Sequence, residues 1–207
     1  ETLQNLNYWR VKMTCIVGIL DRNDDCVYVG ADSLGSSWHD QFLLKNRKVF
    51  KAKDNKNCIM AITGMVKIQN WLSIEEDLIE EVKHLKNEVD FDSIVKYTVP
   101  KIFELAKKYN DITTVDFMTC LSGSLLLAYK NQLYWIESNG QVMESQDDYF
   151  ADGSGIDFAF GVLSQTREKP TVERISAALE AAEMHGRGIK RPFYILNTKN
   201  EDVIEIK

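Results

Sequence analysis

A threonine directly behind a methionine, at the start of an apolar run, is the first residue here that could do covalent chemistry. Thr14 follows Met13 in MTCIVGI, residues 13–19. Removal of Met13 would leave a free α-amino group on Thr14, and such a group has a reference pKa of about 7.7–8.0. Near neutral pH a useful fraction of that amine is neutral and can accept the proton of the threonine's own hydroxyl. Thr14 would then be nucleophile and base together, whereas an internal threonine in a strand is an ordinary β-branched residue.

A terminal nucleophile needs a cation beside it, a carboxylate that holds the cation, and N–H donors for the developing oxyanion. Candidates for the carboxylate, the cation and the N–H donor are Asp32 in GADS, Lys48 in NRKVF and Gly64 in AITG. A small hydroxyl, Ser154, lies in DGSG where a helix is expected to begin. Taken singly, each has a simpler explanation as a turn residue, a solvated lysine or an N-cap, the cap being Asp152 or Ser154.

Groups of strands and helices alternate along the chain and would position these residues. Runs of β-formers predict strands at 14–20, 26–32, 42–52, 57–64, 116–129, 132–138, 192–198 and 201–206. Helical periodicity predicts helices at 65–86, at 92–109 with a kink at Pro100, at 153–163, and at 171–185 with Thr171 as N-cap. The first two strands and the last two are expected to be hairpins. This order predicts an α+β protein with two sheets packed face to face and helix pairs outside, a four-layer αββα sandwich.

Composition and charge bound the kind of protein. The 207 residues are 44% apolar and 27% charged, which is typical of a globular chain that buries a core without disulfide bonds. The net charge of −6 argues against a nucleic acid or an anionic membrane as partner. No apolar run reaches the roughly 18 residues of a membrane-spanning helix. We expect a cytoplasmic protein with one domain at 14–207, preceded by an upstream segment or propeptide at 1–13.

The cysteines and histidines give little sign of a metal or redox site. The four cysteines lack CxxC spacing and lie in apolar stretches, which predicts buried, reduced thiols at Cys15, Cys26, Cys58 and Cys120. The three histidines show no zinc-ligand pattern, so no metal or organic cofactor is expected. Cys15 is a rival nucleophile, but strand alternation places it on the face opposite Thr14.

Taken together, the motifs MTCIVGI, GADS, RKVF, AITG and GSG, in this order, resemble a known family. They look like the proteasome β-subunits and the bacterial proteasome-like proteases, which are N-terminal nucleophile hydrolases. The 16-residue separation between Asp32 and Lys48 agrees with that family, and the resemblance covers nearly everything from Thr14 to Ile206. It implies Thr14 as nucleophile and Lys48 as the cation beside it. It also implies Asp32 as the partner of Lys48, Gly64 as an oxyanion donor and Ser154 as an auxiliary hydroxyl.

The sequence departs from the family pattern at two places. Processed subunits usually have Gly before the nucleophile, whereas this chain has Met13, which favours Met13 as a start residue that is simply removed. The family usually has an Asp and a Ser between the last long helix and the final hairpin, where they help to orient the amine. The corresponding stretch HGRGIKRP, 185–192, contains neither and has Arg187, Lys190 and Arg191 instead.

The function expected from this resemblance is threonine-dependent hydrolysis of amide bonds, with peptides as substrate, inside a homo-oligomeric ring. Two alternatives stay open: an amidase on a small non-peptide substrate, and a catalytically silent scaffold subunit. The gap at 185–192 favours the silent scaffold, whereas the presence of Thr14, Asp32 and Lys48 together favours an enzyme. The sequence carries no signal for an ATPase partner.

Overall fold

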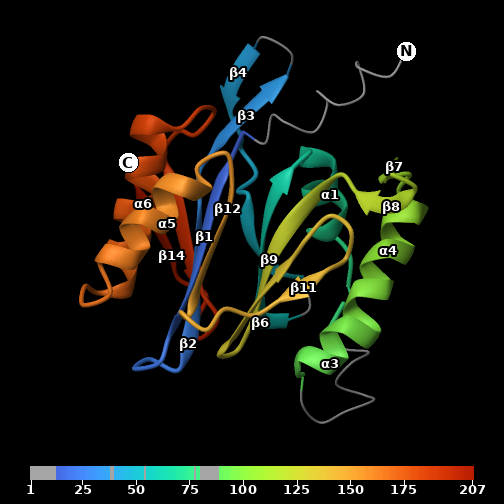
Figure 1. Ribbon diagram of the computed structural model, residues 1–207, viewed down its shortest axis with the longest axis horizontal. Helices are drawn as coiled ribbons and strands as arrows, with labels where there is room; N and C mark the ends of the chain where they lie inside the picture. Colours follow the sequence, from blue (N-terminus) through green and yellow to red (C-terminus); the bar gives the residue numbers. More distant parts are fainter. Residues whose placement is uncertain (1–12, 38–39, 54, 77, 80–88) are drawn as a thin grey trace.

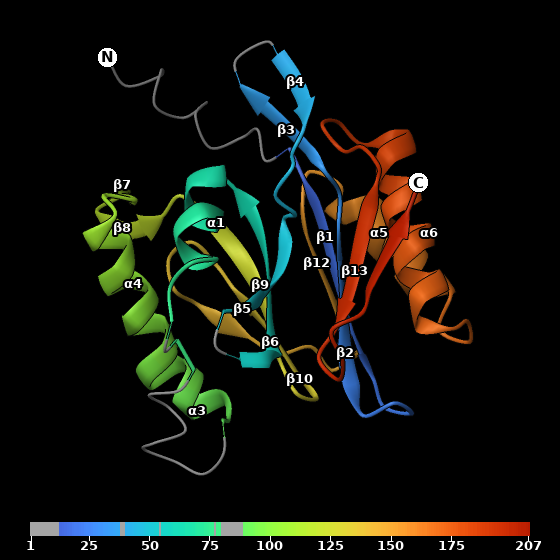
Figure 2. The same ribbon diagram turned by 180° about the vertical axis from the view of Figure 1, so that it is seen from behind.

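Two five-stranded antiparallel sheets pack face to face, and helices cover their outer faces (Figure 1 and Figure 2). The computed structural model describes residues 13–37, 40–53, 55–76, 78–79 and 89–207. The strand order is β12-β1-β2-β13-β14 in the first sheet and β11-β10-β9-β6-β5 in the second. The predicted four-layer αββα sandwich is therefore confirmed.

The first sheet contains the two strands that border the candidate nucleophile. Its members are β1 (Cys15–Asp21), β2 (Cys26–Ala31), β12 (Tyr149–Gly153), β13 (Phe193–Asn197) and β14 (Val203–Ile206). Strand β1 pairs with β2 on one side and with β12 on the other. Helices α5 (Ile156–Gln165) and α6 (Thr171–His185) pack on the outer face, where alanines and leucines of both helices contact the strands. The two predicted hairpins, β1–β2 and β13–β14, are confirmed.

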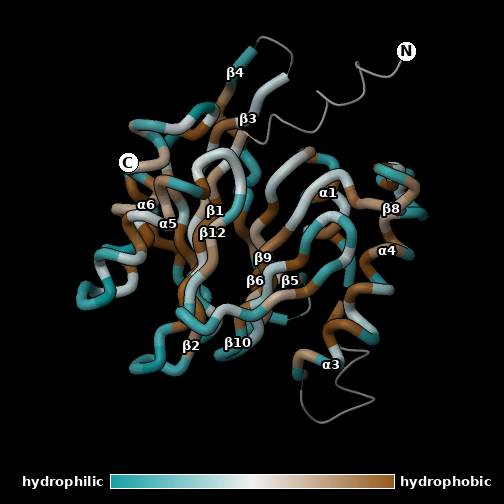
Figure 3. The backbone as a smooth tube through the Cα atoms, in the orientation of Figure 1, coloured by the Kyte–Doolittle hydropathy of each residue, from teal (hydrophilic) through white to brown (hydrophobic). Residues whose placement is uncertain are grey.

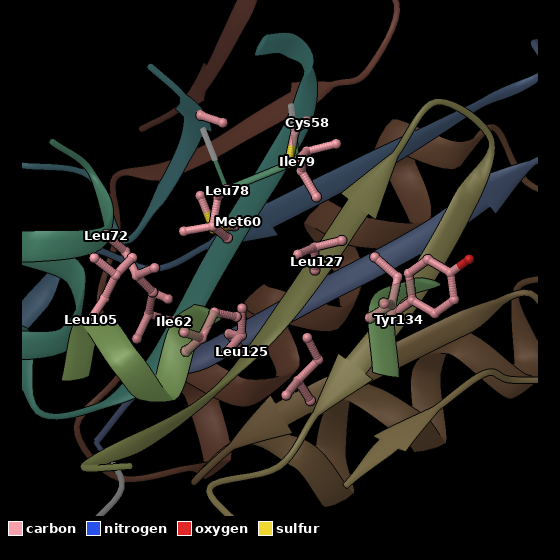
Figure 4. Packing of buried hydrophobic residues seen from close by; sticks show 14 of the residues in the cluster. Cys58, Met60, Ile62, Leu72, Leu78, Ile79, Leu105, Leu125, Leu127 and Tyr134 are labelled. Carbon is pink, nitrogen blue, oxygen red and sulfur yellow. The ribbon is translucent and has the colours of Figure 1, made fainter. Parts of the chain in front are cut away.

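The second sheet supplies the opposite wall of the sandwich. Its members are β5 (Val49–Ala52), β6 (Asn55–Gly64), β9 (Gly123–Tyr129), β10 (Gln132–Ile136) and β11 (Val142–Met143). Its outer face is covered by α1 (Val66–Leu72), α3 (Phe91–Ser93), a π-helical turn (Ile94–Thr98) and α4 (Val99–Lys108). Figure 4 shows how strand residues meet helix residues in this layer, with Met60, Ile62 and Leu125 near Leu72 and Leu105.

Aliphatic side chains fill the space between the sheets. The cluster includes Ile16, Val27, Val29, Ile59, Ala61, Leu126 and Ala128, all at most 1% exposed. Burying each of the larger ones stabilises the fold by about 1.5–3 kcal/mol. Figure 3 shows the same division, with brown strand segments inside and teal at many loops and turns. Within the described residues, no helix is both long enough and apolar enough to span a membrane.

Several element bounds differ from the sequence predictions. The strand expected at 42–52 is two strands: β4 (Asp40–Leu43) and β5, with residues 44–48 between them. Strand β4 pairs with β3 (Leu34–Ser37), which lies outside the predicted strands. The stretch at 116–129 is likewise divided, because β8 (Met118–Leu121) turns back on β7 (Ile112–Val115) before β9 begins. Short strands of this kind are fixed by cross-strand pairing rather than by local propensity.

The helix predictions were partly wrong as well. The helix expected at 65–86 ends as α1 at Leu72, and the part from 80 to 86 lies outside the described residues. The chain passes from the π-helical turn into α4 at Val99, one residue before Pro100, which has no N–H to donate to the preceding turn. Helix α6 has the predicted bounds, but its N-cap is Pro170. The Thr171 hydroxyl donates to Asp21 instead, at 2.6 Å.

Candidate active site

Three predicted site residues meet at one end of the sandwich because each lies at the end of a strand. Thr14 immediately precedes β1, Asp32 immediately follows β2, and Lys48 immediately precedes β5. The first two belong to one sheet and Lys48 to the other. All three are buried, with exposures of 3%, 1% and 4%. The structure thus brings together residues that lie up to 34 positions apart in the chain.

The Lys48 ammonium connects the hydroxyl to the carboxylate. Its Nζ lies 2.9 Å from Thr14 Oγ1 and 2.8 and 3.0 Å from the two oxygens of Asp32. Asp32 also accepts hydrogen bonds from the backbone N–H groups of Cys15, at 3.0 Å, and Leu34, at 2.9 Å. These donors fix the carboxylate, and the carboxylate fixes the ammonium against the threonine hydroxyl.

Burial and mutual attraction act in opposite directions on this ion pair. Burial lowers the pKa of Lys48 and raises the pKa of Asp32, because desolvation disfavours both charged forms. The attraction and hydrogen bonds between the two groups oppose both shifts. A charged ammonium 2.9 Å from Thr14 Oγ1 would stabilise negative charge on that oxygen as it loses its proton.

Gly64, the predicted oxyanion donor, ends strand β6 on the same side of the molecule as Lys48. Successive N–H groups of an antiparallel strand point to opposite neighbours. The N–H of Ile62 donates to the Lys48 carbonyl on the β5 side, and the N–H of Met65 donates to the Ser122 carbonyl on the β9 side. By this alternation the Gly64 N–H points to the β5 side of the sheet. Gly64 itself lies beyond the point where β5 begins.

A cavity of about 630 Å³ lies at this end of the sandwich. Thr14, Lys48 and Gly64 all line it, and apolar side chains of Leu34 and Val66 form part of its wall. Gly64 has φ +99°, a conformation that favours glycine, and a Cβ there would lie 2.5 Å from the Ser122 carbonyl oxygen. The position therefore requires glycine, and the cavity is of a size that accommodates a ligand.

Ser154 lies on the amine side of Thr14. Its Oγ is 3.3 Å from the Thr14 nitrogen and donates to the Arg187 carbonyl at 2.8 Å. Helix α5 is capped by Gly155 without a side-chain hydrogen bond, so neither Ser154 nor Asp152 is its N-cap. The 185–192 stretch, which contains no Asp or Ser, thus reaches Ser154 through a backbone carbonyl.

The carbonyl of Met13 contacts the threonine hydroxyl and the Lys48 ammonium. Its carbonyl oxygen accepts from Thr14 Oγ1 at 2.5 Å and from Lys48 Nζ at 3.3 Å. Its side chain lies against Gly188, which has φ +72° and where a Cβ would collide with it. In the chain that carries Met13, the hydroxyl and the ammonium both engage the preceding peptide.

All four cysteines are free and buried, as the sequence predicted. Cys15 packs with Ala159 and Ala182 of the helix layer, on the face opposite the contact between Thr14 and Lys48. Burial raises the pKa of the Cys15 thiol, which disfavours the reactive thiolate. Within the described residues, no group of three or more His, Cys, Asp or Glu side chains could hold a metal ion.

Three further polar residues border the site and were not predicted to act in it. Thr63, Ser124 and Asp152 come from β6, β9 and β12, and their side chains contact one another. Sequence reasoning considered Asp152 only as a helix cap. The available signal was a polar residue next to a site glycine inside an otherwise apolar strand, as at Thr63 in CIMAITG.

Comparison with known proteins agrees with the fold and with the family resemblance. The family model described as Proteasome subunit matches residues 11–184. Among solved structures, Thiobacillus denitrificans BPH in complex with epoxomicin is 17% identical, with a TM-score of 0.66, and the match covers 88% of this chain and 97% of that chain. Thiobacillus denitrificans BPH is 18% identical at the same TM-score, with 88% and 96% covered. A search of curated proteins finds no match.

The fold and the family match define the class first: this is a domain with the N-terminal nucleophile hydrolase fold. Within that class, the chain belongs to the proteasome subunit family. The family resemblance seen in the sequence motifs is thereby confirmed.

Proposed function

We propose that this chain hydrolyses amide bonds, with peptides as substrates, and that Thr14 is the nucleophile once Met13 is removed. Membership of the proteasome family supports a proteasome-like protease or scaffold subunit, in a family whose members are generally hydrolases. The observation that carries the enzymatic proposal is the 2.9 Å contact between Lys48 Nζ and Thr14 Oγ1, at the edge of a cavity. A scaffold subunit has no need of a buried lysine and aspartate aligned on a hydroxyl.

The proposed reaction proceeds through an ester. The α-amine of Thr14 takes the hydroxyl proton, directly or through a water, and Oγ1 attacks the substrate carbonyl carbon. The Gly64 N–H donates to the resulting oxyanion. When the intermediate collapses, the C–N bond breaks and the leaving nitrogen takes up the proton held by the amine. Water, activated by the same amine, then cleaves the ester and frees the hydroxyl.

Lys48, Asp32 and Ser154 keep the reacting groups in place in this scheme. Lys48 stays protonated and stabilises the developing charge on Thr14 Oγ1, while Asp32 holds the ammonium at 2.8 Å. Ser154 Oγ, 3.3 Å from the Thr14 nitrogen, is the auxiliary hydroxyl that orients the amine. The Arg187 carbonyl in turn holds this hydroxyl.

The proposal extends to a closed homo-oligomeric ring, because relatives in the proteasome family typically form rings. The chain leaves large apolar side chains exposed, among them Phe42, Leu43, Met118 and Met184, each at least 48% exposed. Such side chains would be covered in an assembly. Sedimentation velocity at micromolar concentration should show a defined oligomer, and a monomer would contradict the ring.

Covalent labelling tests the nucleophile. Epoxomicin is the probe, because it is bound in a solved Thiobacillus denitrificans structure of the same fold. A protein that begins at Thr14 should gain the mass of one inhibitor, and a protein that retains residues 1–13 should gain none. In the longer protein the Thr14 nitrogen is a peptide amide without usable basicity. The Met13 carbonyl also engages Thr14 Oγ1 and Lys48 Nζ.

The outcome of this labelling separates the proposed enzyme from its alternatives. A protein proven by intact mass to begin at Thr14 that gains no inhibitor would favour the silent scaffold. Equal labelling of a protein proven to retain residues 1–13 would make Thr14 an ordinary strand residue. Comparing turnover of fluorogenic peptide amides with that of small acyl amides then separates a peptidase from an amidase.

A further inference from the structure

Three buried polar side chains form a compact network directly beneath the candidate site, which we call the polar clamp. It consists of Thr63 in β6, Ser124 in β9 and Asp152 in β12, exposed by 1%, 1% and 3%. Thr63 Oγ1 donates to Asp152 Oδ2 at 2.6 Å and lies 2.8 Å from Ser124 Oγ. The Ser124 hydroxyl donates to the same carboxylate oxygen.

The polar clamp joins the two sheets. Strand β12 belongs to the first sheet, whereas β6 and β9 belong to the second. Around it, the interface between the sheets consists mainly of aliphatic residues such as Ile16, Ala61 and Leu126. Aliphatic contacts resist separation of the sheets but specify their relative position only loosely. Directed hydrogen bonds to one carboxylate specify it tightly, because their geometry is narrow.

Each member of the clamp is a close chain neighbour of a residue in the site. Thr63 precedes Gly64, Ser124 follows the glycine that pairs with Gly64, and Asp152 lies two residues before Ser154. Asp152 Oδ1 also accepts from the N–H of Gly153 at 2.7 Å. Gly153 has φ +103° and approaches the Thr14 carbonyl so closely that a Cβ would collide with it. The Asp152 carboxylate therefore holds the Gly153 backbone beside Thr14 through Oδ1 and the side chains of Thr63 and Ser124 through Oδ2.

We propose that Asp152, acting through Thr63 and Ser124, is a positioning residue that sets the Gly64 N–H against Thr14 and Ser154. This proposal rests on the proposed hydrolysis by Thr14. The oxyanion donor lies on one sheet and the nucleophile on the other, so their separation depends on how the sheets are joined. The clamp lies where a small slip between the sheets would misalign donor and nucleophile. The 185–192 stretch contacts Ser154 through the Arg187 carbonyl, and the Asp152 carboxylate holds the N–H of Gly153, the residue directly before Ser154.

The test compares two buried threonines that differ in their partners. Thr63→Val removes a hydroxyl of the clamp, and Thr98→Val removes a hydroxyl that is 0% exposed and has no hydrogen-bond partner among the described residues. The readout is the second-order rate of epoxomicin labelling, by intact mass, in protein that begins at Thr14. We expect Thr63→Val to slow labelling by roughly tenfold or more per folded molecule, since small misplacements of reacting groups cost rate steeply. Thr98→Val should label at the wild-type rate.

Further variants separate positioning from stability. Thr63→Ser keeps the hydroxyl and should restore most of the rate. Asp152→Asn, which perturbs both hydroxyl contacts, should slow labelling more than Thr63→Val. The pH profile of Thr63→Val should have a lower plateau but an unchanged midpoint, because the amine that titrates is untouched.

The possible failures are distinguishable. If the wild-type protein labels and Thr63→Val labels at the same rate, even with a lower unfolding temperature, the positioning role is wrong and the clamp is only structural. If Thr63→Ser is as slow as Thr63→Val, the hydroxyl is not what matters, and the role is again wrong. If the wild-type protein itself does not label, the proposed function fails, and the positioning role fails with it.

Discussion

Strand β1 connects two polar regions of the molecule that are built in different ways. At its start, Lys48 and Asp32 form an ion pair whose side chains are 5% and 0% exposed. Beyond its end, Arg22 and Asp148 form an ion pair whose side chains are 72% and 27% exposed. Both pairs have short contacts, of 2.8 Å and 2.6 Å. They differ in how much water each charge has lost.

This difference indicates what each pair does. An exposed pair keeps most of its hydration, is screened by salt, and adds little to stability. A buried pair loses its hydration, and the attraction between the charges often does no more than offset that loss. Two apolar residues of similar volume would serve stability as well as Lys48 and Asp32 do. Their placement beside Thr14 Oγ1 therefore points to chemistry rather than to stability.

The largest effect is expected from Lys48→Met. The Thr14 oxygen would lose its stabilising charge, so epoxomicin labelling should slow by about 10²-fold or more. Asp32 would be left as an unpaired buried carboxylate, and the free energy of unfolding at neutral pH should fall by about 3–5 kcal/mol. Labelling rates and urea unfolding curves at neutral pH measure the two effects separately.

The pH dependence and a double variant sharpen this prediction. Burial already raises the pKa of Asp32, and removing Lys48 takes away the attraction that opposes this shift. The stability deficit of Lys48→Met should therefore be full at neutral pH and shrink as the pH falls through the raised pKa, where Asp32 becomes neutral. Asp32→Asn combined with Lys48→Met should recover stability but not labelling. If Lys48→Met is labelled at the wild-type rate, Lys48 has no role in the reaction of Thr14.

The sequence was sufficient for most of the fold because apolar periodicity is strong where elements are long or fully buried. Helix α6 has the predicted bounds, and the hairpin of β1 and β2 follows from two apolar runs around a polar turn. Strand β12 was missed because its register with β1, for example Cys15 opposite Gly153, is a long-range contact. Local propensity does not indicate such a pairing.

The candidate site was predictable only as a pattern. Asp32 and Lys48 taken singly are an ordinary turn residue and an ordinary lysine, and their spacing and order suggested a joint role. The polar clamp was not predictable in this way, because Thr63, Ser124 and Asp152 meet across two sheets. Asp152 is more than 25 positions away from both Thr63 and Ser124, and no local motif connects the three residues.

The smallest effect is expected from Arg22→Met, which matches Lys48→Met in the residue it introduces. Arg22 holds both oxygens of Asp148, with Nε at 2.6 Å and Nη2 at 2.7 Å, a two-point geometry that favours exposed ion pairs. The arginine side chain is nevertheless mostly exposed to water. When it is removed, the Asp148 carboxylate stays hydrated and is not left as a buried, unpaired charge. Labelling of Thr14 should be unchanged, because this pair lies at the far end of β1. The small loss of stability should disappear in high salt, which screens exposed charges but hardly affects a buried pair.

Urea unfolding of the wild-type protein, Arg22→Met and Lys48→Met at low and high salt is the measurement. If Arg22→Met loses as much stability as Lys48→Met, and loses it equally at both salt concentrations, then burial does not distinguish the two pairs. The inference from a buried pair to chemistry would then lose its physical basis.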